Sequence, residues 1–409
     1  MKILMASSFF ASHNGGLERV AGELFRAFTD RGREIVWMAG DITPPPESAG
    51  RSRAVPLRIF DFVEDKIGVP FPIPAPSALA QIIREIRASD VLILHDCLYL
   101  SNIFAFLAAR WRRIPIVIVQ HIGLIPYRNF ALHFIMRFAN SIATRRMLSS
   151  AEQVIFISEI TRRYFGDLRF KRAPELIFNG VNTGLYRPRR GAEKSDIRRK
   201  YGLPTDCHVI LFVGRFVEKK GLPILKLMVS QRPGFVWAFA GMGPLDPKDW
   251  NAPNVRVFPW MNNENLAELY RACDIFALPS KGEGFPLVIQ EALASGLPVV
   301  CGSETSLADC GLAPLVHGTP IHADDDRRTA EEFLLSIDNV IRSQRSELTP
   351  EQVSDFAATR YSLNTAVDRY LSAIGRLVPE HVFQTQGAEI NPRIAGWRGM
   401  EDHKGNAGR

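Results

Sequence analysis

The sequence predicts an α/β protein built of two doubly wound domains that face a central cleft, on the basis of three observations. With 409 residues, the chain is too long for one ordinary hydrophobic core. Short β-branched apolar runs alternate with amphipathic segments in both halves of the chain. A polar segment at residues 186–193 separates the halves, because Arg187-Pro188-Arg189-Arg190-Gly191 fits neither a strand nor a helix period.

Six apolar runs in the first half are predicted to be strands of a buried parallel sheet, because each is apolar on both faces. They are Lys2–Ala6, Ile35–Ala39, Val91–Leu94, Ile116–Val119, Val154–Ile157 and Leu176–Phe178. Between the first two runs, apolar residues recur at helical spacing from Leu17 to Phe28, and Gly32 closes the predicted helix.

The second half repeats this alternation. Its predicted strands are Val209–Val213, Val236–Ala240, Val255–Phe258, Ile275–Leu278 and Val299–Cys301, with helices at Glu264–Ala272 and Leu287–Ser295. Right-handed crossovers place the carboxyl ends of the strands along one edge of each sheet, so the cleft lies between these edges. We predict domains at 1–187 and 188–357, a segment 358–378 whose helix is Ala358–Arg376, and a polar, disordered tail at 379–409.

Composition excludes several classes of protein. With 46% apolar and 23% charged residues, the chain is globular. None of its five cysteines is spaced as C-x-x-C, which argues against a disulfide framework or a zinc site and favours a reducing cytoplasm. No apolar stretch reaches 18 uninterrupted residues, so a spanning helix is not expected, and the short apolar N-terminus is interpreted as a strand and not a signal peptide.

Positive charge is concentrated in the first half, where residues 1–190 hold 26 Lys and Arg against 16 Asp and Glu. Cys97–Ser150 contains seven arginines and no acidic residue, which favours an anionic partner. Within it, Phe130–Ser150 has apolar residues at helical spacing, and this helix could face the core or lie on an anionic membrane. No nucleic-acid-binding motif is present, and no nucleic-acid partner is expected.

The segment Pro279–Ala292 is the most informative for chemistry. A strand ends at Leu278, a glycine-rich loop follows, and Pro286 stands at the start of the next helix. The free backbone N–H groups and positive dipole of such a helix start suit a diphosphate. Glu283 and Glu291 fit as acceptors for hydroxyls of a sugar and of a ribose. An ordinary helix start with a favourable acidic residue is the alternative, and the residue types alone do not separate the two.

Two cations, Arg215 and Lys220, follow the predicted strand Val209–Val213. Beside a diphosphate, paired cations would neutralise the charge that grows on the leaving nucleotide. A surface ion-pair site involving Glu218 is the alternative, and Lys219 is a weaker substitute for Lys220.

Further candidates lie where strands of the first half end. Gly15 and Gly16 follow the first strand, where the lack of a Cβ lets backbone approach a phosphate or sugar, although a plain turn would look the same. His121 could donate to a sugar hydroxyl or shuttle a proton, or it could be a polar edge residue. His95 and Asp96 end the preceding strand and are weaker candidates on the acceptor side.

These segments together resemble the signature of retaining, family-4-type glycosyltransferases of the GT-B fold. The most specific match is Glu283-x7-Glu291 within E-G-F-P-L-V-I-Q-E-A-L-A-S-G-L-P-V. Six further segments match in the expected order, at residues 15–19, 156–159, 178–182, 213–221, 241–244 and 277–280. The resemblance extends from about Lys2 to about Arg376, nearly the whole chain.

The resemblance implies roles for particular residues. Residues 1–187 would bind the acceptor, residues 188–357 would bind the nucleotide-diphosphate sugar, and the helix of 358–378 would return to the first domain. The implied catalytic residues are Glu283, His121, Arg215 and Lys220. The implied donor-binding residues are Gly15, Gly16, Arg215, Lys220, Glu283 (donor sugar), Gly284, Phe285, Leu287 and Glu291 (ribose). Pro286 departs from the small residue usual in the family and removes one backbone donor.

The implied reaction moves a hexose from a nucleotide-diphosphate sugar to an acceptor hydroxyl with retention, in cell-surface polysaccharide or glycolipid biosynthesis. Because many acceptors in this family are saccharides or lipid-linked saccharides, we expect a cytoplasmic protein, peripheral at the anionic inner membrane face. We expect no cofactor and no metal, since the run Asp324–Asp326 fits a helix cap better than a cation site. A nucleotide-sugar epimerase, a phosphorylase and a catalytically silent binding module of the same fold are the alternatives.

Overall fold

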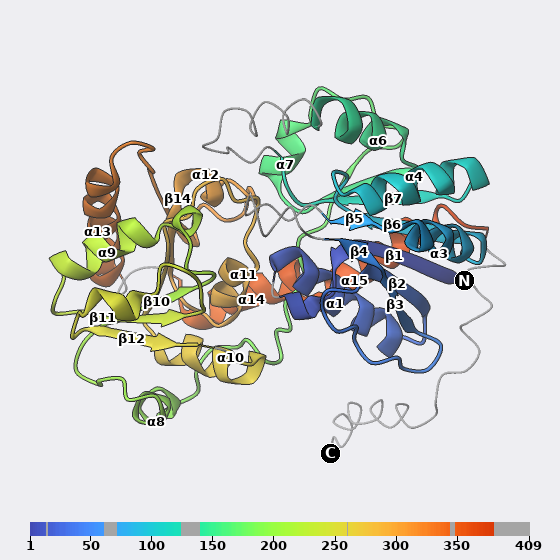
Figure 1. Cartoon of the computed structure of the whole chain (residues 1–409). Coiled ribbons are helices and arrows are strands. Elements are labelled where there is room, and N and C mark those ends of the chain that lie inside the picture. The colour runs from blue at the N-terminus through green and yellow to red at the C-terminus, as the bar shows by residue number, and fades with distance from the viewer. Residues whose placement is uncertain (14, 61–71, 124–139, 260, 344–347, 380–409) are drawn as a thin grey trace, which may run out of the picture.

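A computed structural model of the chain describes all residues except 14, 61–71, 124–139, 260, 344–347 and 380–409. The described residues form two parallel sheets, each covered by helices, that lie side by side (Figure 1). The predicted pair of doubly wound α/β domains is therefore confirmed. The predicted tail, and most of the first half of the predicted helix Phe130–Ser150, lie outside the described residues; the rest of that helix is η2 (Asn140–Thr144) and α6 (Arg145–Ser150).

The N-terminal sheet has the strand order β3-β2-β1-β6-β7-β8-β9, and all neighbouring pairs are parallel. Its strands are β1 (Lys2–Phe9), β2 (Glu34–Gly40), β3 (Arg53–Leu57), β6 (Val91–His95), β7 (Ile116–Gln120), β8 (Gln153–Phe156) and β9 (Glu175–Leu176). The helices of this half are α1 (Gly16–Asp30), α3 (Pro76–Arg87), α4 (Leu100–Arg112), α6 and α7 (Glu159–Tyr164). A short antiparallel pair, β4 (Ile59–Phe60) and β5 (Ile73–Pro74), is separate from this sheet.

The C-terminal sheet has the order β12-β11-β10-β13-β14-β15, again all parallel. Its strands are β10 (Val209–Val213), β11 (Val236–Ala240), β12 (Val255–Phe258), β13 (Ile275–Leu278), β14 (Val299–Gly302) and β15 (Val316–Thr319). Its helices are α8 (Glu193–Lys200), α9 (Leu222–Gln231), α10 (Asn263–Ala272), α11 (Leu287–Ala294), α12 (Ser303–Ser306), α13 (Asp326–Ser343) and α14 (Pro350–Tyr361). β10 and β13 are buried along their whole length, as central parallel strands should be.

The helix predicted over Ala358–Arg376 is in fact two helices, because Ser362 interrupts it. The Ser362 hydroxyl accepts the Thr365 N–H at 3.1 Å and caps a new helix, α15 (Leu363–Gly375). α14 packs on α11 of the C-terminal domain, whereas α15 packs on α1 of the N-terminal domain. At the break, the backbone of Val181 exchanges hydrogen bonds with Tyr361 and Leu363, so the two chain crossings between the domains lie side by side.

The strand orders fix where ligands can bind. Each sheet reverses its direction of winding once, between β1 and β6 in the N-terminal sheet and between β10 and β13 in the C-terminal sheet. In open α/β sheets the crevice at such a switch point, beyond the carboxyl ends of the strands, is the usual ligand site. The predicted site residues follow β1, β7, β10 and β13, so most of them flank these two points.

The described residues lack a membrane-spanning helix and a metal-binding cluster. No described helix has the length and apolar character needed to cross a bilayer. No cluster of three or more His, Cys, Asp or Glu side chains in the described part of the chain is arranged to hold a metal ion. The Asp324–Asp326 run lies at the start of α13, where Asp325 Oδ1 accepts the Arg328 N–H at 2.9 Å.

Candidate active site

The cation-bearing turn after β10 is joined to the glycine-rich loop after β13. The Lys281 N–H donates to the Lys219 carbonyl at 2.9 Å. Gly221, with φ of 80°, lies so close to Pro279 that an added Cβ would overlap the Pro279 carbonyl oxygen. The two loops therefore hold a fixed arrangement beside the switch point of the C-terminal sheet.

This arrangement brings a cation and a carboxylate together. Lys220 Nζ lies 2.8 Å from Glu283 Oε1, and both side chains are largely shielded from solvent. The pair is close but not aligned as a hydrogen bond, so Glu283 keeps capacity to accept one from a ligand. Arg215 is exposed and makes no ion pair with any described residue, which leaves its guanidinium available to an anion.

The glycine-rich loop reaches the N-terminal domain. A Cβ added to Gly284 would lie 2.9 Å from the His121 carbonyl oxygen. The ring of Phe285 is buried and packs edge-on against Phe178 and Tyr361, which anchors the loop at the chain crossings. The structure thus places Lys220, Glu283 and Gly284 opposite His121.

The end of β7 carries a buried titratable cluster. His121 Nε2 lies 3.0 Å from His95 Nδ1, and Asp96 Oδ1 accepts the His121 backbone N–H at 2.8 Å. Burial raises the pKa of Asp96 to about 7 and lowers that of His95 to about 3. Burial and the neighbouring His95 also lower the pKa of His121, so this imidazole is neutral near pH 7 and offers one donor and one acceptor.

We expect this cluster to make stability rise with pH between about 4 and 6.5. In that range the unfolded chain protonates both histidines, whereas the folded chain keeps them neutral, and both therefore favour folding as pH rises. Asp96 acts in the opposite sense, because only the folded state keeps its proton up to about pH 7. The unfolded state binds one net extra proton, a slope of about 1.4 kcal/mol per pH unit.

Urea unfolding at several pH values tests this expectation by comparing the wild type with His95→Asn. Removing one histidine should reduce the slope of the free energy of unfolding against pH by about 1.4 kcal/mol per pH unit. Equal slopes in the two proteins would show that His95 is not buried as a neutral imidazole.

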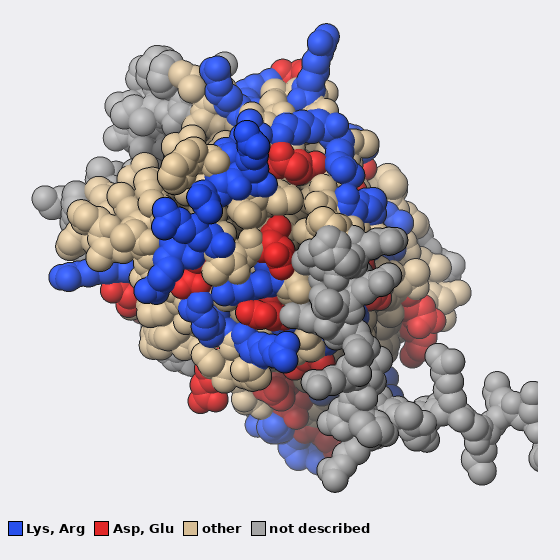
Figure 2. Space-filling view, turned by 90° about the vertical axis from the view of Figure 1, so that its right-hand side faces the viewer, with Lys and Arg blue, Asp and Glu red and all other residues tan. Residues whose placement is uncertain are grey.

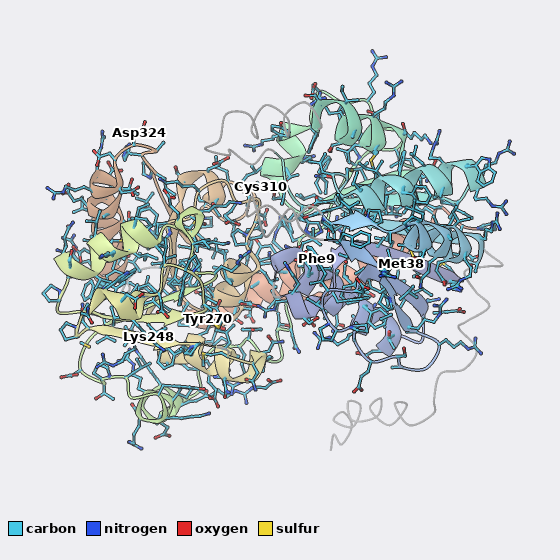
Figure 3. All side chains as sticks on the ribbon, viewed as in Figure 1. Phe9, Met38, Lys248, Tyr270, Cys310 and Asp324 are labelled. Carbon is cyan, nitrogen blue, oxygen red and sulfur yellow. The ribbon has the colours of Figure 1, made fainter. Side chains whose placement is uncertain are left out.

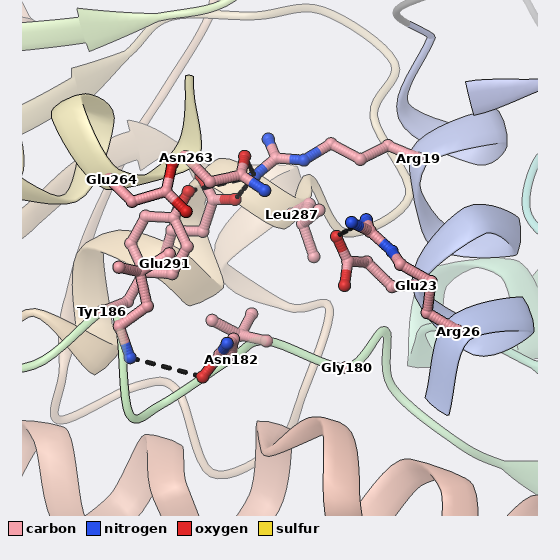
Figure 4. Close-up of a pocket in the computed structure, with 12 residues that line it drawn as sticks. Arg19, Glu23, Arg26, Gly180, Asn182, Tyr186, Asn263, Glu264, Leu287 and Glu291 are labelled. Atoms are coloured by element: carbon pink, nitrogen blue, oxygen red, sulfur yellow. Dashed lines mark hydrogen bonds and ion pairs between the residues drawn. The ribbon is translucent and has the colours of Figure 1, made fainter. Parts of the chain in front are cut away.

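Glu291 lies on the other side of the helix start, and each of its two oxygens accepts a hydrogen bond. Its Oε1 accepts from Arg19 Nη2 at 2.5 Å (Figure 4). Its Oε2 accepts from the Tyr270 hydroxyl at 3.1 Å. Tyr270 belongs to α10 and lies within the C-terminal domain (Figure 3). Arg19 belongs to α1 of the N-terminal domain, so this ion pair joins the two domains.

The remaining predicted donor residues lie at the starts of α11 and α1. Pro286 is the N-cap of α11, so its missing N–H falls before the first helical turn, and Leu287 lines the pocket drawn in Figure 4. Gly15 is the N-cap of α1, where an added Cβ would overlap the Glu18 carboxylate. Gly16 faces open space, since a Cβ there would meet no atom within 4 Å.

Arg19 contacts Glu291 in the candidate site and was not predicted to take part in it. It lies within a matched segment, at residues 15–19, but no role was assigned to it. A signal was present, because a cation in the first turn of a helix opposes the helix dipole unless a carboxylate compensates it. Its partner Glu291 is 272 positions away, which no local pattern reveals.

Two doubly wound domains that meet where Gly284 approaches His121, with a cation and carboxylates nearby, have the architecture of the GT-B class. The family model "Glycosyltransferase Family 4" matches residues 14–185, and "Glycosyl transferases group 1" matches residues 193–346. The chain belongs to the family-4-type glycosyltransferases of the GT-B fold, as the sequence predicted.

Several known proteins are similar to this chain. D-inositol 3-phosphate glycosyltransferase 1 of Catenulispora acidiphila is 28% identical over 72% of this chain and 76% of its own length. The corresponding protein of Mycolicibacterium smegmatis is 26% identical over 71% and 68%. Among solved structures, sucrose-phosphate synthase from Thermosynechococcus elongatus has a TM-score of 0.69 at 18% identity, covering 92% of this chain and 99% of that one. Anabaena HepE in complex with UDP and glucose has a TM-score of 0.68 at 18% identity, with the same coverage.

Proposed function

We propose that this glycosyltransferase takes a hexose from a nucleotide-diphosphate sugar and passes it to an acceptor hydroxyl with retention of configuration. The main support is the Lys220–Glu283 pair, 2.8 Å apart, in the loops beside the start of α11, where Gly284 meets the backbone of His121. Cations and helix-end N–H groups suit a diphosphate, and carboxylates suit sugar hydroxyls. The solved complex of HepE with UDP and glucose favours the same class of donor.

In the proposed reaction, Arg215, Lys220 and the free N–H groups of α11 stabilise the departing diphosphate. Glu283 and His121 orient the sugar. The bond from the anomeric carbon to the diphosphate breaks while the bond to the acceptor oxygen forms on the same face, and the acceptor proton passes to the leaving phosphate. Because side-chain cations supply the positive charge, the reaction needs no metal ion or other cofactor.

In this proposal the two domains bind different substrates. Residues 1–187 bind a saccharide or lipid-linked saccharide acceptor, and residues 188–357 bind the nucleotide-sugar donor. Residues 358–378 close the structure, with α15 packed on α1. The product would enter cell-surface polysaccharide or glycolipid biosynthesis.

A two-stage experiment tests the proposal. UDP-, GDP- and ADP-hexoses are first screened for thermal stabilisation of the protein, since a ligand selective for the folded state raises the melting temperature. The best donor is then incubated with saccharide and lipid-linked acceptors, and the anomeric configuration of the product is read by NMR. A product with inverted configuration, or no donor that stabilises the protein, refutes the proposal.

The same experiment separates the alternatives. An epimerase would change the sugar without any acceptor, and a phosphorylase would require inorganic phosphate. A silent binding module would bind a donor and never turn it over.

We also propose that the protein works in the cytoplasm, at the inner face of an anionic membrane. The support is an apolar and basic strip on α4, in which Leu107 and Trp111 are one turn apart and are 59% and 70% exposed. Arg110, Arg112 and Arg113 lie beside them. Figure 2 shows Lys and Arg side chains gathered in a broad band on the outer side of the N-terminal domain, where α3 and α4 end. Such a combination suits headgroups that are anionic and an interface that accepts aromatic rings.

Replacing Trp111 by serine is expected to weaken binding to vesicles that contain phosphatidylglycerol about fivefold, because about 1 kcal/mol of apolar burial is lost. Vesicle sedimentation measures this binding. Leu335→Ser is the control, since Leu335 is a similarly exposed apolar side chain, at 57%, but lies on α13 of the other domain. Equal loss in both variants, or equal binding of the wild type to neutral vesicles, would contradict the proposed surface.

A further inference from the structure

The family resemblance assigns Glu291 to the donor ribose, but Arg19 of the other domain already binds this carboxylate. Arg19 donates to one oxygen of Glu291 at 2.5 Å, and the Tyr270 hydroxyl donates to the other at 3.1 Å. Only 1% of the Glu291 side chain is exposed. A carboxylate oxygen can accept a second hydrogen bond, but the Glu291 oxygens are covered. Arg19, at 28% exposed, is the more solvent-facing partner of the pair, so it has to move before a ribose diol can reach Glu291.

We infer that Arg19 and the nucleoside of the donor compete for Glu291, which makes Arg19 a residue that controls donor affinity. This inference rests on the proposed function, because it takes a nucleotide as the ligand of Glu291. We call the Arg19–Glu291 ion pair the latch.

The latch is held by more than one bond. Arg19 Nη2 also lies 3.0 Å from the Tyr186 hydroxyl and 3.1 Å from Asn263 Oδ1, so α1 is tied to the interdomain segment, α10 and α11. Burial alone would lower the pKa of Arg19, but Glu291 and the nearby tyrosines raise it above its usual value. The guanidinium therefore stays charged, and a partly desolvated ion pair of this kind is costly to break without a replacement partner.

A replacement partner lies in the same pocket. The pocket of Figure 4 has a volume of about 130 Å³ and is lined by Arg19, Glu291 and two further carboxylates, Glu23 and Glu264. Glu23 is four residues after Arg19 on α1, a spacing at which Arg and Glu side chains can meet. It already pairs with Arg26 at 2.5 Å. A displaced Arg19 can thus find a carboxylate without leaving the pocket, which gives its side chain two discrete positions.

The exchange couples donor binding to the N-terminal domain. Arg19 lies one turn after Gly16, where the first strand–helix turn faces open space. When a ribose takes Glu291, the tie that α1 makes to α11 is released, so binding of the nucleoside shifts the balance between latched and released arrangements. If the latch is formed in about 90% of empty molecules, the apparent affinity for nucleotide is reduced about tenfold.

Calorimetric titration with UDP, GDP and ADP tests the inference on the full chain. The nucleotide that binds the wild type should bind Arg19→Gln about tenfold more tightly, which is about 1.4 kcal/mol. Arg19→Met, which cannot form new hydrogen bonds, should behave alike. Arg328→Gln is the matched control, because Arg328 also pairs with a carboxylate of its own helix, Glu332 of α13, but does not line the pocket. The affinity of this variant should equal that of the wild type.

The melting temperature of each empty variant supplies a second measurement. Loss of the latch should lower the melting temperature of the empty protein while the affinity for nucleotide rises. Structural damage would instead lower both the melting temperature and the affinity. Unchanged or weaker nucleotide binding in both Arg19 variants overturns the inference and leaves the proposed function standing. If no nucleotide binds the wild type or the variants, the proposed function itself fails, and the inference fails with it.

Discussion

Replacing Lys220 by methionine is expected to lower kcat for sugar transfer about 10²- to 10³-fold. Methionine keeps much of the length of the side chain but removes the charge that lies 2.8 Å from Glu283. Negative charge on the diphosphate grows as the bond to the sugar breaks, so Lys220 contributes more in the transition state than in the bound ground state. The loss should therefore appear mainly in kcat, with a smaller change in KM, when both are measured with the best donor.

Lys219→Met is the matched control for this prediction. Lys219 is adjacent in sequence, but the contact that joins it to the donor loop uses its backbone carbonyl, which accepts the Lys281 N–H. The kcat of Lys219→Met should stay within about twofold of the wild-type value, as is usual for side chains that make no key interaction. If Lys220→Met keeps half or more of the wild-type kcat, Lys220 is not a catalytic residue.

The sequence predicts central strands well and edge strands unevenly. β10, β11 and β13 have the bounds that were predicted, because each is a continuous apolar run between polar or glycine residues. The edge strand β12 also has the predicted bounds, although Arg256 interrupts its apolar run. β3 was missed, since this edge strand contains Pro56 and alternates between buried and exposed positions. β15, with the sequence Val-His-Gly-Thr, has little apolar signal and is defined mainly by its pairing with β14.

The same contrast holds for the candidate site. Residues that follow strands, such as Lys220, Glu283 and His121, could be found because parallel topology places strand ends together. The break at Ser362 could not, since apolar residues at helical spacing continue through it while the two helices pack on different domains. The contact between Arg19 and Glu291 depends on how the domains close on each other, and that geometry has no local signature in the chain.

Gly221→Ala is expected to lower the free energy of unfolding by about 2–5 kcal/mol and to reduce transfer activity with it. At φ of 80° the residue lies in the left-handed region, and a Cβ would overlap the Pro279 carbonyl oxygen. The two atoms nearest to the added Cβ are the carbonyl oxygen and carbonyl carbon of Pro279. Because both belong to the backbone, neither can turn aside as a flexible side chain would. The turn that carries Lys220 would then be pushed away from the loop that carries Glu283.

Gly202→Ala separates this steric effect from the cost of the backbone conformation. Gly202 also has a positive φ, 63°, but an added Cβ there would meet no atom within 4 Å. Alanine at 202 should therefore cost only about 1–2 kcal/mol, the usual penalty for a left-handed residue, and should leave kcat unchanged. Urea unfolding and donor turnover measured on both variants decide the matter. If the two substitutions cost the same, the close approach of Gly221 to Pro279 does not hold Lys220 in place, and the fixed arrangement of the two loops would need another origin.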